Sequence, residues 1–377
     1  MNLHILHPEK VAGRAITMFE NALPNENIYL FINHNWESYD DAKATAHRYD
    51  DKIVYLDSDG IPEKDMDFSS IDRVFIHYLD LPKIRFIKKY GLESRKICWI
   101  CWGGDLTNNI LQYLGYKMYS RFPGPITERI KYKMGIHRFY RKSDELKEIL
   151  DFIENHLNVM ATAFSSEFQL AKKWLPKEMA NVSLMEFFYY PIDDVLPLNI
   201  RDRWSKNKHV FLGHSASFTG NHKEAFKRLG RIDIKSRKII VPINYNGTTW
   251  NKNHIKSLGK KYCGNQCSFL ESFMPLSEYN ELMLQADRFI FNNWRQEAWG
   301  NIQIALYMGA KVFLSKNSLL SKHLKELGLH FEYTENLNQT TFDEDLTIQQ
   351  KEENRRIIIS MYSMQRSSRV CKALCDM

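Results

Sequence analysis

Short apolar segments alternate with helical stretches along the first half of the chain. Each segment ends in polar or glycine residues, and the stretches between them place apolar residues at helical spacing. The predicted strands are residues 3–7, 28–33, 52–56, 73–78, 96–102 and 159–164. Strands that alternate with helices in this way form a parallel sheet covered by helices. The pattern therefore predicts an α/β fold.

A polar stretch separates this series from a second one. Residues 192–208 are rich in Asp, Pro, Arg and Lys, and further strands are predicted at 209–212, 239–241, 289–291 and 312–314. We expect two Rossmann-like domains that face a cleft, formed by residues 1–195 and 205–340. Residues 345–377 form a third, helical segment. Its long helix, from 348 to about 375, has apolar positions suited to packing, and a return to the amino-terminal domain is one arrangement.

Composition supports two domains and limits the choice of partners. The chain has 377 residues, of which 44% are hydrophobic, so each domain can bury a core. The net charge of +7 is modest and no nucleic-acid-binding module is recognisable, so nucleic acid is not an expected partner. Basic and aromatic residues gather between 116 and 142, which suits an anionic membrane surface. The cluster includes Arg121, Arg129, Lys131 and Lys133.

Neither a membrane span nor a metal centre is expected. No apolar run approaches the length of a bilayer crossing, and residues 1–6 are interpreted as a short strand, not a signal peptide. We expect a cytoplasmic protein, soluble or peripheral. Cys98 and Cys101 lie three apart on one strand, so they point to opposite faces and do not suit zinc. The acidic pair Asp57 and Asp59 offers few ligands for a divalent ion and is interpreted as a surface turn.

Two loops of the second domain carry groups that suit a diphosphate. In the first, a strand is followed by a glycine, which lets backbone amides approach a phosphate, and by serines, which add hydroxyl donors. The alternative is a capped loop in which serine and asparagine make local turn bonds. The residues concerned are Gly213, His214, Ser215, Ser217 and Asn221.

The second loop follows the strand that ends at residue 291. A helix begins directly after it, and the N–H groups and dipole at a helix start attract a diphosphate. Ligands of parallel sheets also lie outside the carboxyl ends of the strands. The alternative is an ordinary strand–turn–helix unit. The predicted nucleotide-sugar-binding residues here are Arg295, Gln296, Glu297, Gly300 and Asn301, with Tyr245 and Phe273 from neighbouring loops.

The first domain contains candidates for a general base. Asp105 follows two glycines at the end of the strand 96–102, where a carboxylate could take a proton from an acceptor hydroxyl. The alternative is that Asp105 caps the next helix. His7 and His34 each end a predicted strand and are rival candidates for the base or for contact with the acceptor.

Taken in order, these motifs resemble glycosyltransferase family 56, the TDP-Fuc4NAc:lipid II transferases of enterobacterial common antigen and related polysaccharides such as O-antigen. The resemblance rests on four segments: Trp99 to Leu106, Gly213 to Ser215 with Asn221, Val241-Pro242 with Tyr245, and Arg295-Gln296 ahead of Gly300. It implies a GT-B fold with the donor nucleotide in the carboxyl-terminal domain. It also implies a polyprenyl-diphosphate-linked acceptor, approached from the amino-terminal domain at the inner face of the bacterial plasma membrane.

Departures from the family pattern bear on the donor and the mechanism. The family's glycine-asparagine-serine loop reads Gly213-His214-Ser215 here, so the donor sugar can differ. Many retaining GT-B enzymes carry two glutamates eight residues apart, and Gln296 and Ile304 stand near those positions. This favours an inverting mechanism without a metal or other cofactor. Asp105 would activate the acceptor while the Arg295 turn stabilises the departing diphosphate.

Two alternatives stay open from the sequence. One is a GT-B enzyme that uses a UDP- or GDP-sugar for another surface glycan. The other is a non-catalytic protein that binds a nucleotide or a lipid.

Overall fold

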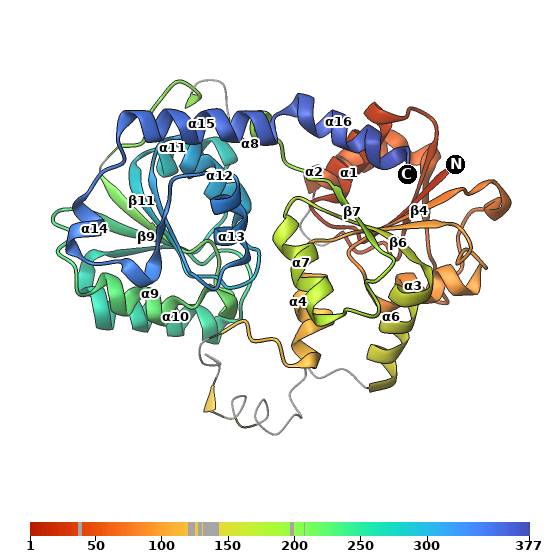
Figure 1. Cartoon of the computed structure of the whole chain (residues 1–377), viewed down its shortest axis with the longest axis horizontal. Coiled ribbons are helices and arrows are strands. Elements are labelled where there is room, and N and C mark those ends of the chain that lie inside the picture. Colours follow the sequence, from red (N-terminus) through yellow and green to blue (C-terminus); the bar gives the residue numbers. More distant parts are fainter. Residues whose placement is uncertain (37–39, 120–124, 127–129, 131–142, 197–199, 207) are drawn as a thin grey trace. The chain divides into compact units, whose positions relative to one another are not determined.

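The computed structural model describes the whole chain except residues 37–39, 120–124, 127–129, 131–142, 197–199 and 207. It divides into two compact units, each built on one parallel sheet (Figure 1). The first unit comprises Met1–Tyr116, Arg138–Tyr189 and Gln365–Met377. The second comprises Lys117–His137 and Tyr190–Met364.

The first unit has the strand order β3-β2-β1-β4-β5-β6-β7, which reverses direction between β1 and β4. Every pairing is parallel, and Ile5 lies between Leu30 on one neighbouring strand and Ile76 on the other. The strands are β1 Asn2–Leu6, β2 Asn27–Phe31, β3 Ile53–Tyr55, β4 Arg73–His77, β5 Lys96–Ile100, β6 Leu157–Thr162 and β7 Ser183–Glu186. The helices are α1 Ala12–Ala22, α2 Asp40–Ala46, α3 Leu81–Lys89, α4 Gly104–Asn109, α6 Ser143–His156 and α7 Ser165–Trp174.

Both faces of the first sheet are buried, because successive residues of a strand point to opposite sides. Cys98 joins the core on one face, and Trp99 and Cys101 join the core on the other. This confirms the predicted opposition of Cys98 and Cys101. All six cysteines are free thiols.

The second unit repeats this architecture with the strand order β10-β9-β8-β11-β12-β13, which reverses between β8 and β11. The strands are β8 His209–Leu212, β9 Lys238–Pro242, β10 Cys267–Leu270, β11 Ala286–Phe291, β12 Lys311–Leu314 and β13 Glu332–Tyr333. The helices are α8 Ile192–Val195, α9 His222–Leu229, α10 Thr249–Cys263, α11 Leu276–Leu284, α12 Trp299–Tyr307, α13 Leu319–Glu326 and α14 Gln339–Asp343.

The carboxyl-terminal segment is two helices and not the single predicted one. α15 (Ile348–Tyr362) packs on α12 and α8 of the second unit, with Tyr362 against Trp299 at 4.7 Å between ring centroids. Ser363 is extended and ends α15, and α16 (Met364–Cys375) follows (Figure 1). α16 belongs to the first unit, where Cys371 donates a hydrogen bond to the carbonyl of Met18 in α1. The segment therefore returns to the amino-terminal unit after one extended residue.

Candidate active site

The predicted nucleotide-binding loops meet at one edge of the second sheet. Because its strands are parallel, the segments after β8, β9, β10 and β11 all leave the sheet on the same side. β8 and β11 are neighbours, so the loop that begins at Gly213 lies beside the turn that contains Arg295. The strand order reverses between these two strands, which is where open α/β sheets bind their ligands.

The buried carboxylate of Glu297 joins the two loops. Its two oxygens each lie 2.7 Å from the hydroxyl of Thr219 in the β8 loop. Asn293 donates to the same carboxylate, and Nε of Arg295 donates to it at 2.6 Å. The Thr219 hydroxyl also bonds to that of Ser217 at 2.7 Å. The site is therefore a network centred on an anion, and two of its members, Thr219 and Asn293, were not among the predicted residues.

The charge state of Glu297 follows from its neighbours. Burial by itself raises the pKa of this carboxyl. The adjacent Arg295 and His214, with hydrogen bonds from Thr219 and Arg295, outweigh burial and hold the pKa below its ordinary value. Glu297 is therefore ionised at neutral pH and forms an ion pair with the guanidinium of Arg295. The ion pair fixes Arg295 at the edge of the sheet where the strand order reverses.

Gly213 and Gly220 make room for the ring of His222. Gly213 has a φ of +74°, and a Cβ there would lie 2.9 Å from Nε2 of His222. A Cβ at Gly220 would lie 2.4 Å from Cε1 of the same ring. Burial lowers the pKa of His222 to about 4, so the ring is neutral. Packing against His222 thus accounts for the glycine at 213, and the approach of its backbone to a phosphate stays a prediction.

Asn221 and Ser215 brace the loop from within. Asn221 has a left-handed backbone with φ +46°, and its amide donates to the carbonyl of Asn292 at 3.1 Å. Asn292 donates back to the carbonyl of Asn221 at 3.2 Å. The buried Ser215 accepts from the backbone of Ser217 at 3.3 Å. The local-bond alternative therefore describes Asn221 and Ser215 better than ligand contact, whereas His214 and Ser217 remain partly exposed.

The other predicted residues lie in the loops around this network. The carbonyl of Tyr245 accepts from Ala216 at 2.8 Å, which ties the β9 loop to the β8 loop. Asn301 donates to the phenol of Tyr279 at 2.8 Å. Phe273 is 73% exposed beyond β10. Gln296 and Gly300 are partly exposed, and a Cβ built at Gly300 meets no atom within 4 Å among the described residues beyond its chain neighbours and its own helix backbone.

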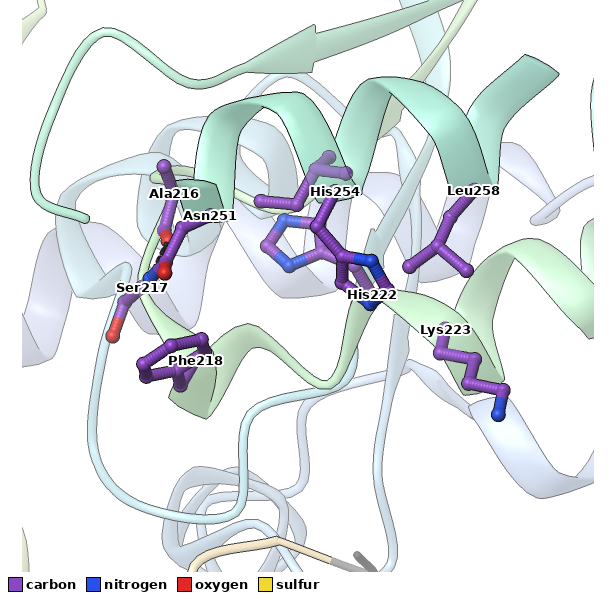
Figure 2. A pocket seen from close by; sticks show the side chains of 9 residues that line it. Ala216, Ser217, Phe218, His222, Lys223, Asn251, His254 and Leu258 are labelled. Carbon is purple, nitrogen blue, oxygen red and sulfur yellow. Dashed lines mark hydrogen bonds between the residues drawn. The ribbon is translucent and has the colours of Figure 1, made fainter. Parts of the chain in front are cut away.

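A small pocket lies behind the β8 loop. His222 of α9 and His254 of α10 project into it, while Lys223 points away (Figure 2). The amide of Asn251 donates to the carbonyl of Ala216 at 3.2 Å at one side (Figure 2). The cavity of about 20 Å³ is far below the several hundred Å³ of a typical ligand site. This pocket is therefore too small to hold a nucleotide.

Asp105 of the first unit occupies a fully buried position. Its carboxylate accepts from the indole of Trp99 at 2.6 Å and from the backbone of Leu79 and Trp102 at 3.0 Å each. Leu106 N and Cys101 Sγ complete the shell. Burial raises the pKa of Asp105, although these hydrogen bonds oppose the shift. With no exposed surface, the carboxylate does not reach an acceptor hydroxyl in this conformation, which argues against the base assignment. It does not cap α4 either, because the N-cap is Gly103 and no side chain bonds there. Asp105 instead joins Trp99 to the turn at Leu79.

His7 and His34 differ in their surroundings. His7 follows β1 and its Nε2 is hydrogen-bonded to Oδ2 of Asp80, which follows β4. His34 is 56% exposed and bonds to Glu63 at 2.7 Å on the surface. His7 is therefore less exposed than His34, and a carboxylate at a neighbouring strand end fixes the orientation of its ring.

The family model for 4-alpha-L-fucosyltransferase glycosyl transferase group 56 matches residues 139–374, which is more than half of the chain. The protein belongs to glycosyltransferase group 56. It is therefore a glycosyltransferase, and membership argues against the non-catalytic alternative. No curated protein sequence matches the chain.

Solved structures show that this group 56 enzyme has the GT-B fold. A glycosyltransferase from Rickettsia africae is 13% identical, with a TM-score of 0.62 and coverage of 100% of this chain and 97% of the other. HepE of Anabaena, in complex with UDP and glucose, is 10% identical, with a TM-score of 0.61 and coverage of 100% and 99%. Sucrose-phosphate synthase from Thermosynechococcus elongatus is 10% identical, with a TM-score of 0.60 and coverage of 100% and 98%.

The residues considered for metal or membrane binding lie outside the Glu297 network of this group 56 chain. Within the described residues, no cluster of three or more His, Cys, Asp or Glu could hold a metal ion. Oδ1 of Asp57 accepts from the backbone of Asp59 at 2.9 Å and of Ile61 at 2.8 Å, as in a turn. None of the described helices is long and apolar enough to cross a bilayer. Arg121, Arg129, Lys131 and Lys133 lie outside the described residues.

Proposed function

We propose that this glycosyltransferase moves a deoxyamino sugar, Fuc4NAc, from a TDP-sugar to a polyprenyl-diphosphate-linked oligosaccharide. The product belongs to a bacterial surface polysaccharide, either enterobacterial common antigen or O-antigen. The observation that supports a donor site is the Arg295–Glu297–Thr219 network at the strand-order reversal of the second sheet. The specific donor and acceptor come from the family resemblance of the sequence.

In this proposal the second unit stabilises the leaving group. When the bond between the anomeric carbon and the diphosphate breaks, negative charge grows on the leaving oxygen. Arg295, fixed by Glu297, and the start of α12, where no side chain caps the helix, suit that charge. Both are in place before the reaction, so no reorganisation is needed as the charge develops.

We propose an inverting, metal-independent reaction. A retaining enzyme of the type with two glutamates would need a second glutamate eight residues after the first. The residue eight positions after Glu297 is Ala305, which is buried on α12. The carboxylate of Glu297 is itself occupied by Thr219, Asn293 and Arg295.

We also propose that the protein works as a peripheral protein on the inner face of the plasma membrane. The support is compositional: basic and aromatic residues are mixed between 116 and 142, and such segments bind anionic lipid surfaces. Retention on vesicles with anionic lipid, but not on neutral ones, would be the expected result in a flotation assay.

A UDP-sugar is the second candidate donor. HepE, which has the same fold, is described in complex with UDP-glucose. Calorimetric titration with TDP, UDP and GDP, each with and without magnesium, separates the candidates. Preference for TDP without a metal requirement supports the first proposal, whereas preference for UDP or GDP favours the second. Transfer from the matching nucleotide-sugar to a lipid-linked acceptor then tests the reaction itself.

A further inference from the structure

The first unit holds a histidine–carboxylate pair where the strand order of its sheet reverses. His7 comes directly after β1 and Asp80 comes three residues after β4, and these two strands are neighbours. Nε2 of His7 is hydrogen-bonded to Oδ2 of Asp80. The side chains are 23% and 11% exposed, so the pair is enclosed but reachable from solvent.

The ionisation of Asp80 follows from its neighbours. Burial by itself raises the pKa of this carboxyl, but the charge of Lys83 and the hydrogen bond from His7 outweigh it, and the pKa is about 2. The buried ammonium of Lys83 lies 2.9 Å from Oδ2 of Asp80. Burial lowers the pKa of the Lys83 amine, and the nearby charge of Asp80 opposes this shift only in part. At neutral pH we nevertheless expect Asp80 and Lys83 both to be charged, because each stabilises the charged form of the other.

The tautomer of His7 follows from the charge of Asp80. An ionised carboxylate only accepts hydrogen bonds, so Nε2 of His7 carries the hydrogen. In the neutral imidazole Nδ1 then holds the lone pair. Among the described residues none is hydrogen-bonded to Nδ1. The ring therefore presents a basic nitrogen whose orientation is fixed from the other side.

The turn that carries Asp80 is held in a strained conformation. Tyr78 has a φ of +68°, which is costly for a residue with a bulky side chain. Its carbonyl accepts from Nζ of Lys83 at 3.0 Å, and its N–H donates to Ile100 at 3.1 Å. Leu79 donates to the buried Asp105 at 3.0 Å. Such strain persists only where the surroundings enforce it, and it gathers at functional sites.

A purely structural role accounts for only part of this arrangement. Asp80 is the N-cap of α3, and its Oδ1 accepts from the backbone of Lys83 at 3.3 Å. Capping employs Oδ1, whereas the bonds to His7 and to the ammonium of Lys83 employ Oδ2. The cap therefore does not require His7.

We propose that His7 is the general base that accepts the proton of the acceptor hydroxyl, with Asp80 as its positioning residue. This rests on the proposed sugar transfer. As the hydroxyl oxygen bonds to the anomeric carbon, its proton passes to Nδ1 of His7. The bond between the anomeric carbon and the diphosphate breaks, and its electron pair leaves on the nucleoside diphosphate. The imidazolium is stabilised by the Asp80 carboxylate until it returns the proton to solvent.

The substitution His7→Gln tests the base. Glutamine keeps an N–H donor near the place of Nε2 but has no basic nitrogen. We expect kcat to fall about 100- to 10,000-fold, while the acceptor KM and the nucleotide affinity stay within about threefold of wild type. His47→Gln is the matched control, because His47 also pairs with a carboxylate, Asp50 at 3.0 Å, but on the exposed surface. It should leave kcat unchanged.

Two further measurements separate catalysis from folding. His7→Gly should regain part of its turnover when imidazole is added, which a lost structural contact would not do. Asp80→Asn combined with Lys83→Met removes both buried charges together and should lower kcat with KM unchanged. Turnover of folded His7→Gln within threefold of wild type would overturn the assignment, as would no effect of imidazole on His7→Gly. If the wild-type protein transfers no sugar from any nucleotide donor, the proposed function itself fails.

Discussion

The hydroxyl of Thr219 lies 2.7 Å from both carboxylate oxygens of Glu297, and this contact connects two loops that are 78 residues apart. The carboxylate is buried, so removing one of its hydrogen-bond donors leaves its charge less well stabilised. The network thus has a stability role that can be measured independently of any substrate.

Thr219→Val should lower the free energy of unfolding by about 1.5–3 kcal/mol, the usual value of a hydrogen bond to a charged group. Valine has nearly the same shape but cannot donate. Urea unfolding of the purified protein measures the difference. Thr340→Val, at an exposed position on α14, should change stability by less than about 0.5 kcal/mol. Equal effects of the two substitutions would contradict a central role for the Thr219–Glu297 contact.

Arg295→Ala should weaken binding of the nucleoside diphosphate by about 1.5–3 kcal/mol, or roughly 10- to 150-fold in Kd. The reason is the loss of a positioned cation at the strand ends. Because Glu297 would lose its ion-pair partner, the double change Arg295→Ala with Glu297→Gln should bind equally weakly and fold better. Calorimetry gives both affinities.

Arg203→Ala is the control for that experiment. Arg203 also pairs with a glutamate of the second unit, Glu281 at 2.6 Å, but it is not part of the Glu297 network. Its removal should leave nucleotide affinity unchanged. If both arginine variants lose affinity to the same degree, general electrostatic attraction and not a positioned Arg295 explains the binding.

The sequence identifies the central strands more readily than the edge strands. β1, β4, β8 and β11 are buried on both faces and therefore appear as continuous apolar runs. Among the described edge strands, β7, β10 and β13 are partly exposed and lack such runs, and the pattern does not predict them, whereas the edge strand β3 is predicted at 52–56. The break at Ser363 was also missed, because helical spacing continues on both sides of it.

For the site, too, some features are visible in the sequence and others depend on the fold. Polar residues at strand ends are visible in the sequence, so the loops that contain Gly213 and Arg295 were found. Which polar residue of a loop faces Glu297 depends on loop geometry, and Thr219 was missed for that reason. From the sequence Asp105 fits a cap and a base equally well, whereas its burial and the N-cap at Gly103 depend on the fold. The partner of His7 is 73 residues away, and no local pattern connects the two.

Gly220→Ala should destabilise the second unit by about 1–3 kcal/mol, because the new Cβ would lie 2.4 Å from Cε1 of His222. Gly300→Ala offers a contrast. Its Cβ meets no described residue within 4 Å outside its own helix, and alanine favours a helix by up to about 1 kcal/mol. Thermal unfolding should therefore rank Gly300→Ala at or above wild type and Gly220→Ala well below it. The reverse order would be inconsistent with the packing of His222.

Stability should fall as the pH drops from about 6.5 toward 4. Burial lowers the pKa of His4 to about 3 and that of His222 to about 4, whereas an unfolded histidine titrates near 6.5. In this window the unfolded chain binds protons that the folded chain does not, so each histidine contributes a slope of up to about 1.4 kcal/mol per pH unit. The stability that these neutral histidines contribute is fully present above pH 6.5 and is lost as the pH falls toward 4.

Denaturant unfolding at several pH values measures this slope. His4→Gln removes one such group, so its stability should depend less steeply on pH than that of wild type. His47→Gln, at an exposed position, should leave the slope unchanged. An unaltered slope in His4→Gln would mean that His4 is already protonated in the folded state.

Asp105→Asn distinguishes a structural role, in which the carboxylate holds the turn at Leu79, from the base role. The carboxylate accepts from five donors, namely Leu79 N, Trp99 Nε1, Trp102 N, Leu106 N and Cys101 Sγ. Asparagine would place its NH2 group, a hydrogen-bond donor, against these N–H donors. The free energy of unfolding should therefore fall by about 1–3 kcal/mol. Turnover per folded molecule should fall less than about tenfold, because Leu79 and the turn to Asp80 would shift only slightly. A base would behave in the opposite way, with stability kept and turnover reduced about 100-fold or more. Measured together, unfolding and kcat therefore decide whether Asp105 shapes the turn that holds Asp80 or takes the proton itself.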